Sequence, residues 1–212
     1  EVAYQKGELD QFFHRYYYDA NSRLKEVETS IDAFHWSTEA NYFYYDHGPL
    51  ARVELGENKV QGVDYAYTIQ GWLKAINGTK DSDSDGTAGI NQYLAKDVFG
   101  LELGYYDGDY EPVGGTNSSG ILLSNNLTYG TGDECGVSLY NGNIAFRLSD
   151  LPADSEQIML SKYRYDPLNR LKSMLGIVNG DETYAKSNYV YDASGNIREL
   201  NRSGLNGSSI SQ

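Results

Sequence analysis

One phrase recurs along this chain and limits its possible folds. Its clear copies are YYYDANSRLKEV from Tyr16, YRYDPLNRLKSM from Tyr163 and YVYDASGNIREL from Tyr189. Two looser copies, YYDHGPLARVEL from Tyr44 and YAYTIQGWLKAI from Tyr65, keep the aromatic pair but shift or lose the aspartate. Self-similarity at a period of twenty to fifty residues is typical of repeat architectures, in which each copy builds the same small unit. Because an active site needs each of its residues once, the repetition favours a scaffold.

Each copy has the pattern of a β-hairpin. Tyr163 and Tyr165 lie two residues apart, so in a strand they point to the same face. The following DPLN segment has turn chemistry, with an aspartate that accepts backbone hydrogen bonds and an asparagine that tolerates a left-handed conformation. Alternation then resumes, with Leu171 and Ile197 expected inward and Arg170 outward. The phrase therefore predicts one hairpin per copy.

A single hairpin is marginally stable in water, so the copies are expected to stack side by side. The predicted fold class is all-β, with stacked antiparallel hairpins and at most one short helix near 90–99. Asp166 and Asp192 are 26 residues apart, and Asp19 and Asp46 are 27 apart. We expect the structure of the repeat to depend on Tyr18, Asp19, Leu24, Tyr165, Asp166, Leu171, Tyr191, Asp192 and Ile197.

The distribution of the phrase predicts the organisation of the chain. Residues 1–76 and 161–202 carry repeat hairpins, whereas 77–160 is predicted to be a β-rich insertion with long polar loops. Within the insertion, LYNGNIAF predicts a tight hairpin at Asn141–Gly142. Residues 203–212 are predicted to form a flexible tail, and both ends have the pattern of cuts in a longer chain.

Composition narrows the classes of partner. The 20 tyrosines against 6 phenylalanines suit half-buried strands, in which the ring packs and the hydroxyl reaches water or a backbone group. The net charge of −13 disfavours a nucleic-acid partner, because it repels phosphate. No run of apolar residues is long enough for a transmembrane helix. With the single cysteine Cys135, no intrachain disulfide can form.

One segment offers a candidate metal site. Asp81, Asp83 and Asp85 occupy positions one, three and five of a calcium-loop template. The twelfth position is Gln92, which cannot supply the bidentate carboxylate of that template. Calcium is therefore the one cofactor considered, and a solvated acidic loop is the alternative.

Catalytic residues are not predicted. Each repeat aspartate begins the same turn, so a structural role explains all of them without the opposed carboxylate pair of a glycosidase. The three histidines, His14, His35 and His47, match no metal-ligand spacing, and Cys135 has no Cys-His signature. Trp36 and Trp72 could stack on a ligand such as a sugar, or they could pack within the protein.

The phrase resembles the YD repeats of the RHS family, which are shared with teneurins and with insecticidal Tc-toxin components. The resemblance covers about 13–76 and 140–202, and the wider sequence is similar to RHS proteins of Bacteroidetes-type bacteria. It implies a long β-strip that curves into a hollow shell, which in bacterial toxins encloses a C-terminal effector. Two family features are absent: a DPxGxxD-like core motif and a following effector domain.

The resemblance implies a non-enzymatic segment of a secreted or cell-surface bacterial protein. Its partners would be the remainder of its own shell, an encapsulated effector and the export machinery. Two alternatives remain open. One is a surface module that recognises a glycan or a protein through Trp36, Trp72 and the loop at 77–89. The other is a glycosidase or self-cleaving peptidase, for which the sequence offers no recognisable nucleophile or carboxylate pair.

Overall fold

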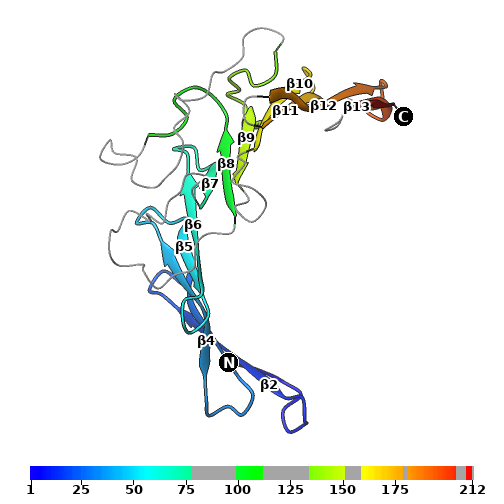
Figure 1. The fold of residues 1–212 in the computed structure, drawn as a ribbon. Helices are drawn as coiled ribbons and strands as arrows, with labels where there is room; N and C mark the ends of the chain where they lie inside the picture. Colours follow the sequence, from blue (N-terminus) through cyan, green and yellow to red (C-terminus); the bar gives the residue numbers. More distant parts are fainter. Residues whose placement is uncertain (78–98, 112–133, 151–158, 179–180, 204–208, 212) are drawn as a thin grey trace. The chain divides into compact units, whose positions relative to one another are not determined.

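The protein is an antiparallel β-protein in which strands follow one another in the order of the chain (Figure 1). The computed structural model describes residues 1–77, 99–111, 134–150, 159–178, 181–203 and 209–211. These residues contain 14 strands and no helix, which confirms the predicted all-β class. The helix expected near 90–99 falls almost entirely outside them. Within this described part, no helix is long and apolar enough to cross a membrane.

The chain divides into two units, which we describe separately. The first unit is built on Glu1–Ala66, and each of its strands pairs with the next along the chain. Its strands are β1 (Val2–Tyr4), β2 (Phe12–Tyr18), β3 (Leu24–Ser30), β4 (Ser37–Tyr44), β5 (Leu50–Leu55) and β6 (Gln61–Tyr67).

The second unit begins at Tyr67 and follows the same rule of pairing. The strands β8 and β9, from the predicted insertion, pair in sequence between β7 and β10. The strands are β7 (Leu73–Ile76), β8 (Gly100–Gly104), β9 (Phe146–Asp150), β10 (Met159–Tyr165), β11 (Leu171–Val178), β12 (Asp181–Tyr191), β13 (Ile197–Ser203) and β14 (Ser209–Ser211).

Four hairpins share an irregularity of register. In each, the pairing shifts at the tyrosine that immediately precedes the turn. Such β-bulges increase the local twist and re-aim a side chain. The four tyrosines are Tyr18, Tyr44, Tyr165 and Tyr191.

The core of the second unit is small. Ala145, Phe146 and Leu148 are buried together, and Leu139 and Leu160 pack against them. Phe146 lies against the backbone of β8, where Gly104 leaves room for its ring, because a Cβ at this position would lie 1.8 Å from the ring carbon Cζ. The core therefore lies where β8 and β9 pair, within the segment that lacks the repeat phrase.

Two expectations for single residues are wrong. Ile197, expected inward, is 55% exposed. Asn141–Gly142 does not join two strands in a tight hairpin, because the residues immediately before it have no strand structure and β9 begins only at Phe146. Gly142 does adopt the positive φ (86°) expected of a turn glycine.

Candidate functional site

The repeated feature of the structure is a five-residue turn between paired strands. The N–H of its first residue donates to the carbonyl of the fifth, and the N–H of the fourth donates to the carbonyl of the first. The fourth residue always has a positive φ, which glycine and asparagine adopt most readily. The first residues of these turns are Asp19, Tyr45, Thr68, Asp166 and Asp192.

The repeat aspartates bond to both sides of their turns. The Oδ1 atom of Asp166 accepts the backbone N–H groups of Leu168 and Arg170, both at 2.9 Å, and Oδ2 accepts Arg170 Nε at 2.6 Å. Asp19 makes the same three contacts with Asn21 and Arg23. These bonds to the charged form, led by the backbone N–H of the arginine, lower the pKa of both carboxyls.

In the turn that begins at Asp192, an uncharged side chain takes the place of the arginine. Its Oδ1 atom accepts the backbone N–H groups of Ser194 and Asn196 at 2.9 and 2.8 Å. The side-chain amide of Asn196 donates to Oδ2 at 3.0 Å, in the position that arginine occupies elsewhere. This amide is the first cause of the lowered pKa of Asp192. The turn geometry therefore tolerates either an arginine or an asparagine at its fifth position.

The arginine side chain connects its turn to the next hairpin. The Arg170 guanidinium lies 4.6 Å from the ring centroid of Tyr191, whose hydroxyl donates to the carbonyl of Leu171 at 2.7 Å. Arg23 lies 4.4 Å from the ring of Tyr44, and the Tyr44 hydroxyl donates to Leu24 at 2.7 Å. We call this set of aspartate, arginine and following tyrosine the repeat clasp. It ties β2–β3 to β4 in the first unit and β10–β11 to β12 in the second.

Sequence reasoning missed the clasp because it assigned the arginine to the solvent side. The side chain of Arg170 is only 30% exposed. The signal was present as an aspartate and arginine four residues apart, followed 21 residues later by a tyrosine, in both Asp19–Tyr44 and Asp166–Tyr191.

The looser copies keep the backbone turn without the aspartate. Tyr45, and not Asp46, occupies the first turn position, so this turn begins 26 residues after that of Asp19 and the aspartate is shifted by one position, as the sequence indicated. The Tyr45 hydroxyl donates to the carbonyl of Tyr65 at 2.7 Å. In the other loose copy, the hydroxyl oxygen of Thr68 accepts the N–H of Trp72 at 3.2 Å.

Asp19 allows the role of the turn carboxylate to be measured. Because its pKa is lowered in the folded protein, its contribution is complete above the unfolded pKa of about 3.9 and is lost as the pH falls through the lower folded value. We expect Asp19→Asn to lower the urea midpoint at neutral pH, and the difference from the unmodified protein to shrink below about pH 4. The control is Asp46→Asn, one residue beyond the equivalent turn position, which should leave the midpoint unchanged. Equal effects of both variants would contradict the assigned role.

A buried ion pair lies in the second unit, outside the repeat turns. Lys74 Nζ is 2.7 Å from Asp109 Oδ1, and both side chains are 0% exposed. The backbone N–H of Tyr105 donates to the other carboxylate oxygen of Asp109 at 2.8 Å. The Tyr105 hydroxyl donates to the carbonyl of Leu73 at 2.8 Å, and burial raises the pKa of this phenol. The pair therefore fixes the segment after β8 against β7.

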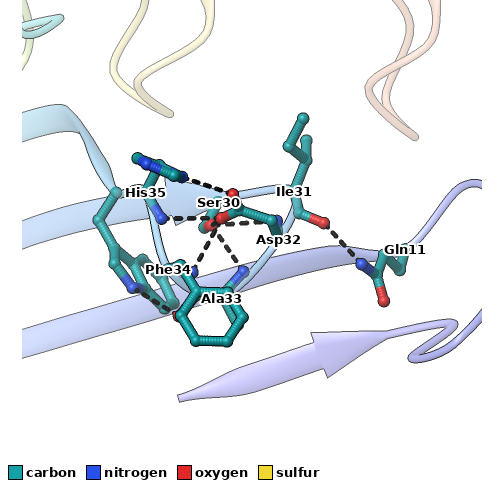
Figure 2. A network of polar contacts seen from close by, with 8 residues as sticks. Gln11, Ser30, Ile31, Asp32, Ala33, Phe34 and His35 are labelled. Carbon is teal, nitrogen blue, oxygen red and sulfur yellow. Dashed lines mark hydrogen bonds and ion pairs between the residues drawn. The ribbon is translucent and has the colours of Figure 1, made fainter.

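The loop between β3 and β4 is organised by one carboxylate (Figure 2). The Oδ1 atom of Asp32 accepts the backbone N–H groups of Phe34 and His35, both at 2.8 Å. Its Oδ2 atom lies 2.6 Å from His35 Nδ1. The hydrogen bond and charge of Asp32 raise the pKa of His35, and the His35 side chain is the first cause of the lowered pKa of Asp32. The hydroxyl of Ser30 and the amide of Gln11, which donates to Ile31, complete the network.

The histidine of this loop should titrate above its ordinary value of about 6.5. Because the pKa is raised, the contact stabilises the loop below that value and is lost as the pH rises through the folded pKa. An NMR titration of the His35 ring should show the raised pKa, and Asp32→Asn should return it to about 6.5. The control variant Asp46→Asn should not move the titration. An unchanged titration in Asp32→Asn would contradict the assignment.

The two tryptophans are engaged within the protein. The Trp36 ring lies 3.7 Å from the Arg15 guanidinium, and its Nε1 donates to the carbonyl of Ala33 at 3.2 Å. The Trp72 ring contacts that of Tyr105, with centroids 4.9 Å apart. Both rings therefore make contacts within the protein, and the expectation that they stack on a ligand stays a prediction.

Among the described residues, the remaining candidates form no common site. Asp81, Asp83 and Asp85 lie outside the described residues. Cys135 has its sulfur 3.2 Å from the Ser173 hydroxyl oxygen. In the part of the chain that the structure describes, no three side chains of His, Cys, Asp and Glu are grouped to hold a metal ion.

These features define a class: an open antiparallel repeat sheet whose successive hairpins are joined by side-chain clasps. Solved structures share this fold. The chain matches TcdB2-TccC3 without its hypervariable C-terminal region with a TM-score of 0.58 and 18% identity, over 94% of this chain and 8% of that one. It matches TcdB2-TccC3-Cdc42 with a TM-score of 0.57 and 18% identity, over 93% of this chain and 8% of that one. The likeness is one of fold, and it agrees with an RHS-like β-sheet.

No protein-family model and no curated protein matches the chain.

Proposed function

We propose that this chain is a non-catalytic structural segment of a larger, secreted or cell-surface RHS/YD-repeat protein. Its sheet would form part of a shell wall that encloses or displays an effector domain. The repeat clasp carries the proposal, because it joins one hairpin to the next by a contact that any further copy of the phrase could extend. The likeness to TcdB2-TccC3 adds support at the level of the fold. The partners would be the rest of the shell, the enclosed effector and the export machinery.

The chemistry of the repeat turns supports a structural role for their aspartates. A general acid needs a carboxyl whose pKa is raised towards the working pH. Asp19, Asp166 and Asp192 have lowered pKa values, because turn N–H groups and the side chain at the fifth position bond to the charged form. They are suited to remain permanent acceptors. The activity of the whole protein would then belong to the enclosed domain.

Protease protection in the full-length protein tests the proposal. A shell predicts that an internal domain resists added protease, whereas the isolated domain is cut. Weakening the wall with Tyr44→Ala and Tyr191→Ala should make that domain accessible, because both rings belong to clasps. The matched control is Tyr18→Ala: Tyr18 also precedes a repeat turn, but it is 60% exposed and belongs to neither clasp, so its loss should not open the wall. A full-length protein without any protected domain would overturn the proposal.

A further inference from the structure

We propose that the second unit carries a binding site for a neutral oligosaccharide, centred on the ring of Tyr140. The site goes beyond the scaffold role proposed above. It is formed by Tyr106, Tyr140 and a group of side-chain amides, none of which belongs to the repeat clasp.

The centre of the site is an exposed aromatic stack. The rings of Tyr106 and Tyr140 have centroids 4.6 Å apart and planes inclined by 25°. Tyr140 is nevertheless 72% exposed, so the stack leaves most of this residue accessible to a ligand. The clasp tyrosines differ, because an arginine lies against their rings and their hydroxyls bond to strand carbonyls. Tyr140 therefore offers an unused aromatic surface.

Three asparagine side chains form a hydrogen-bonded group that begins at Asn141, the residue after Tyr140. The amide nitrogens of Asn141 and Asn143 both donate to Asn169 Oδ1, at 2.9 and 3.0 Å. The backbone N–H of Asn143 donates to Asn141 Oδ1 at 3.1 Å. Within the described residues this leaves Asn169 Nδ2 as a donor and Asn143 Oδ1 as an acceptor for a ligand. Gln70 adds a further amide, which donates to the Tyr106 hydroxyl at 2.6 Å.

The backbone beneath the site is held in place. The N–H of Leu139 donates to the carbonyl of Tyr105 at 2.6 Å, and the N–H of Asp107 donates to the Ser138 hydroxyl at 3.1 Å. Gly142 lies against the Trp72 ring, where an added Cβ would be 3.3 Å from Cζ2. Trp72 thus supports the site from within the protein. A platform that is ordered before binding loses less conformational entropy when a ligand arrives.

The chemistry of these groups selects the ligand class. The negative face of an aromatic ring attracts the C–H groups of a sugar ring, and amides that both donate and accept suit neighbouring hydroxyls. The residues that form the site, Gln70, Tyr106, Tyr140, Asn141, Asn143 and Asn169, are all uncharged. Without a cationic group, and with a net charge of −13 on the chain, an anionic glycan or a phosphate is disfavoured. A neutral oligosaccharide fits these groups.

The test uses the intact chain and named probes. Maltohexaose, cellohexaose, mannohexaose and chitohexaose would be titrated by calorimetry, with a heparin hexasaccharide as the anionic comparison. We expect at least one neutral probe to bind, Tyr140→Ala to weaken that binding at least about tenfold, and Tyr140→Phe to retain it. Asn169→Gly should also weaken binding, because it removes the free donor while glycine still accepts the positive φ (61°) of this turn position. The control is Tyr18→Ala, an equally conservative loss of an exposed ring in the first unit.

The outcomes separate clearly. Because Tyr140 is largely exposed, its replacement should leave the circular dichroism spectrum and the urea midpoint unchanged, so lost binding would not reflect unfolding. Failure of all four neutral probes, binding of heparin alone, or equal binding by Tyr140→Ala would each overturn the proposal. None of these results would bear on the protease-protection test, so the two proposals can fail independently.

Discussion

Replacing Asp109 with alanine is expected to lower the stability of the second unit by about 3–5 kcal/mol, the usual cost of leaving one charge of a buried pair alone. The side chains of Lys74 and Asp109 are both 0% exposed, and Nζ of Lys74 lies 2.7 Å from Oδ1 of Asp109. The variant would leave the ammonium group of Lys74 without its carboxylate, and the backbone N–H of Tyr105 without its acceptor. Urea unfolding followed by far-ultraviolet circular dichroism would measure the loss.

A double variant shows whether Asp109→Ala loses stability because a charge is left buried or because packing is disturbed. Lys74→Met combined with Asp109→Leu replaces both charges with apolar groups, and buried pairs replaced in this way are often as stable as the original or more so. We expect the double variant to recover part of the stability that Asp109→Ala loses, because it removes the buried charge of Lys74 but still leaves the backbone N–H of Tyr105 without its acceptor. Lys59→Ala serves as the control, since Lys59 is 58% exposed and its pair with Glu54 should contribute about 1 kcal/mol or less. A double variant as unstable as the single one would contradict this account.

Gly104→Ala is the second large effect that we expect. A Cβ at this position would lie 1.8 Å from Cζ and 2.0 Å from Cε1 of Phe146, so the ring must move. Phe146 is 3% exposed and belongs to the small core of the second unit, which leaves it little room. Overpacking of this kind costs about 1–3 kcal/mol, and we expect the upper end of that range.

The matched control for this substitution lies in the same unit. An added Cβ at Gly176 would meet the Cβ of Ala185 at 3.1 Å, a contact that a small shift can relieve. Gly176→Ala should therefore be clearly milder in the same urea experiment. Combining Gly104→Ala with Phe146→Leu should cost less than the sum of the two single variants, because the smaller side chain makes room for the added methyl group. Additive costs would show that the two residues do not compete for space.

The hairpins could be predicted from the sequence because their determinants are local. A tyrosine pair, an aspartate and a residue that accepts a positive φ lie within seven positions of one another, as in Tyr163–Asn169. The local alternation of the strands also predicted the antiparallel class, because hairpins that follow one another closely along the chain pair with their neighbours. The function of Arg170 was missed because an alternating pattern assigns it to a face without indicating that the next tyrosine covers it.

The candidate sugar site could not be predicted for a related reason. Tyr106 and Tyr140 are 34 residues apart, and Asn141 is 28 residues from Asn169. No repeat spacing links these positions, so only the tertiary structure brings them together. Lys74 and Asp109 are separated by 35 residues and were not recognised as a pair for the same reason.

Pairing of each strand with its neighbour along the chain has a consequence for how the protein folds. Most neighbouring strands are joined by short turns, which keeps their contacts local in sequence. The pairing of β8 with β9 is an exception, because it joins residues 42–50 positions apart. Folding can start at any hairpin and spread to the adjacent one, without waiting for a distant partner. During synthesis, each hairpin could thus join the sheet soon after it leaves the ribosome, and the growing edge would remain unpaired only for the time needed to translate one repeat.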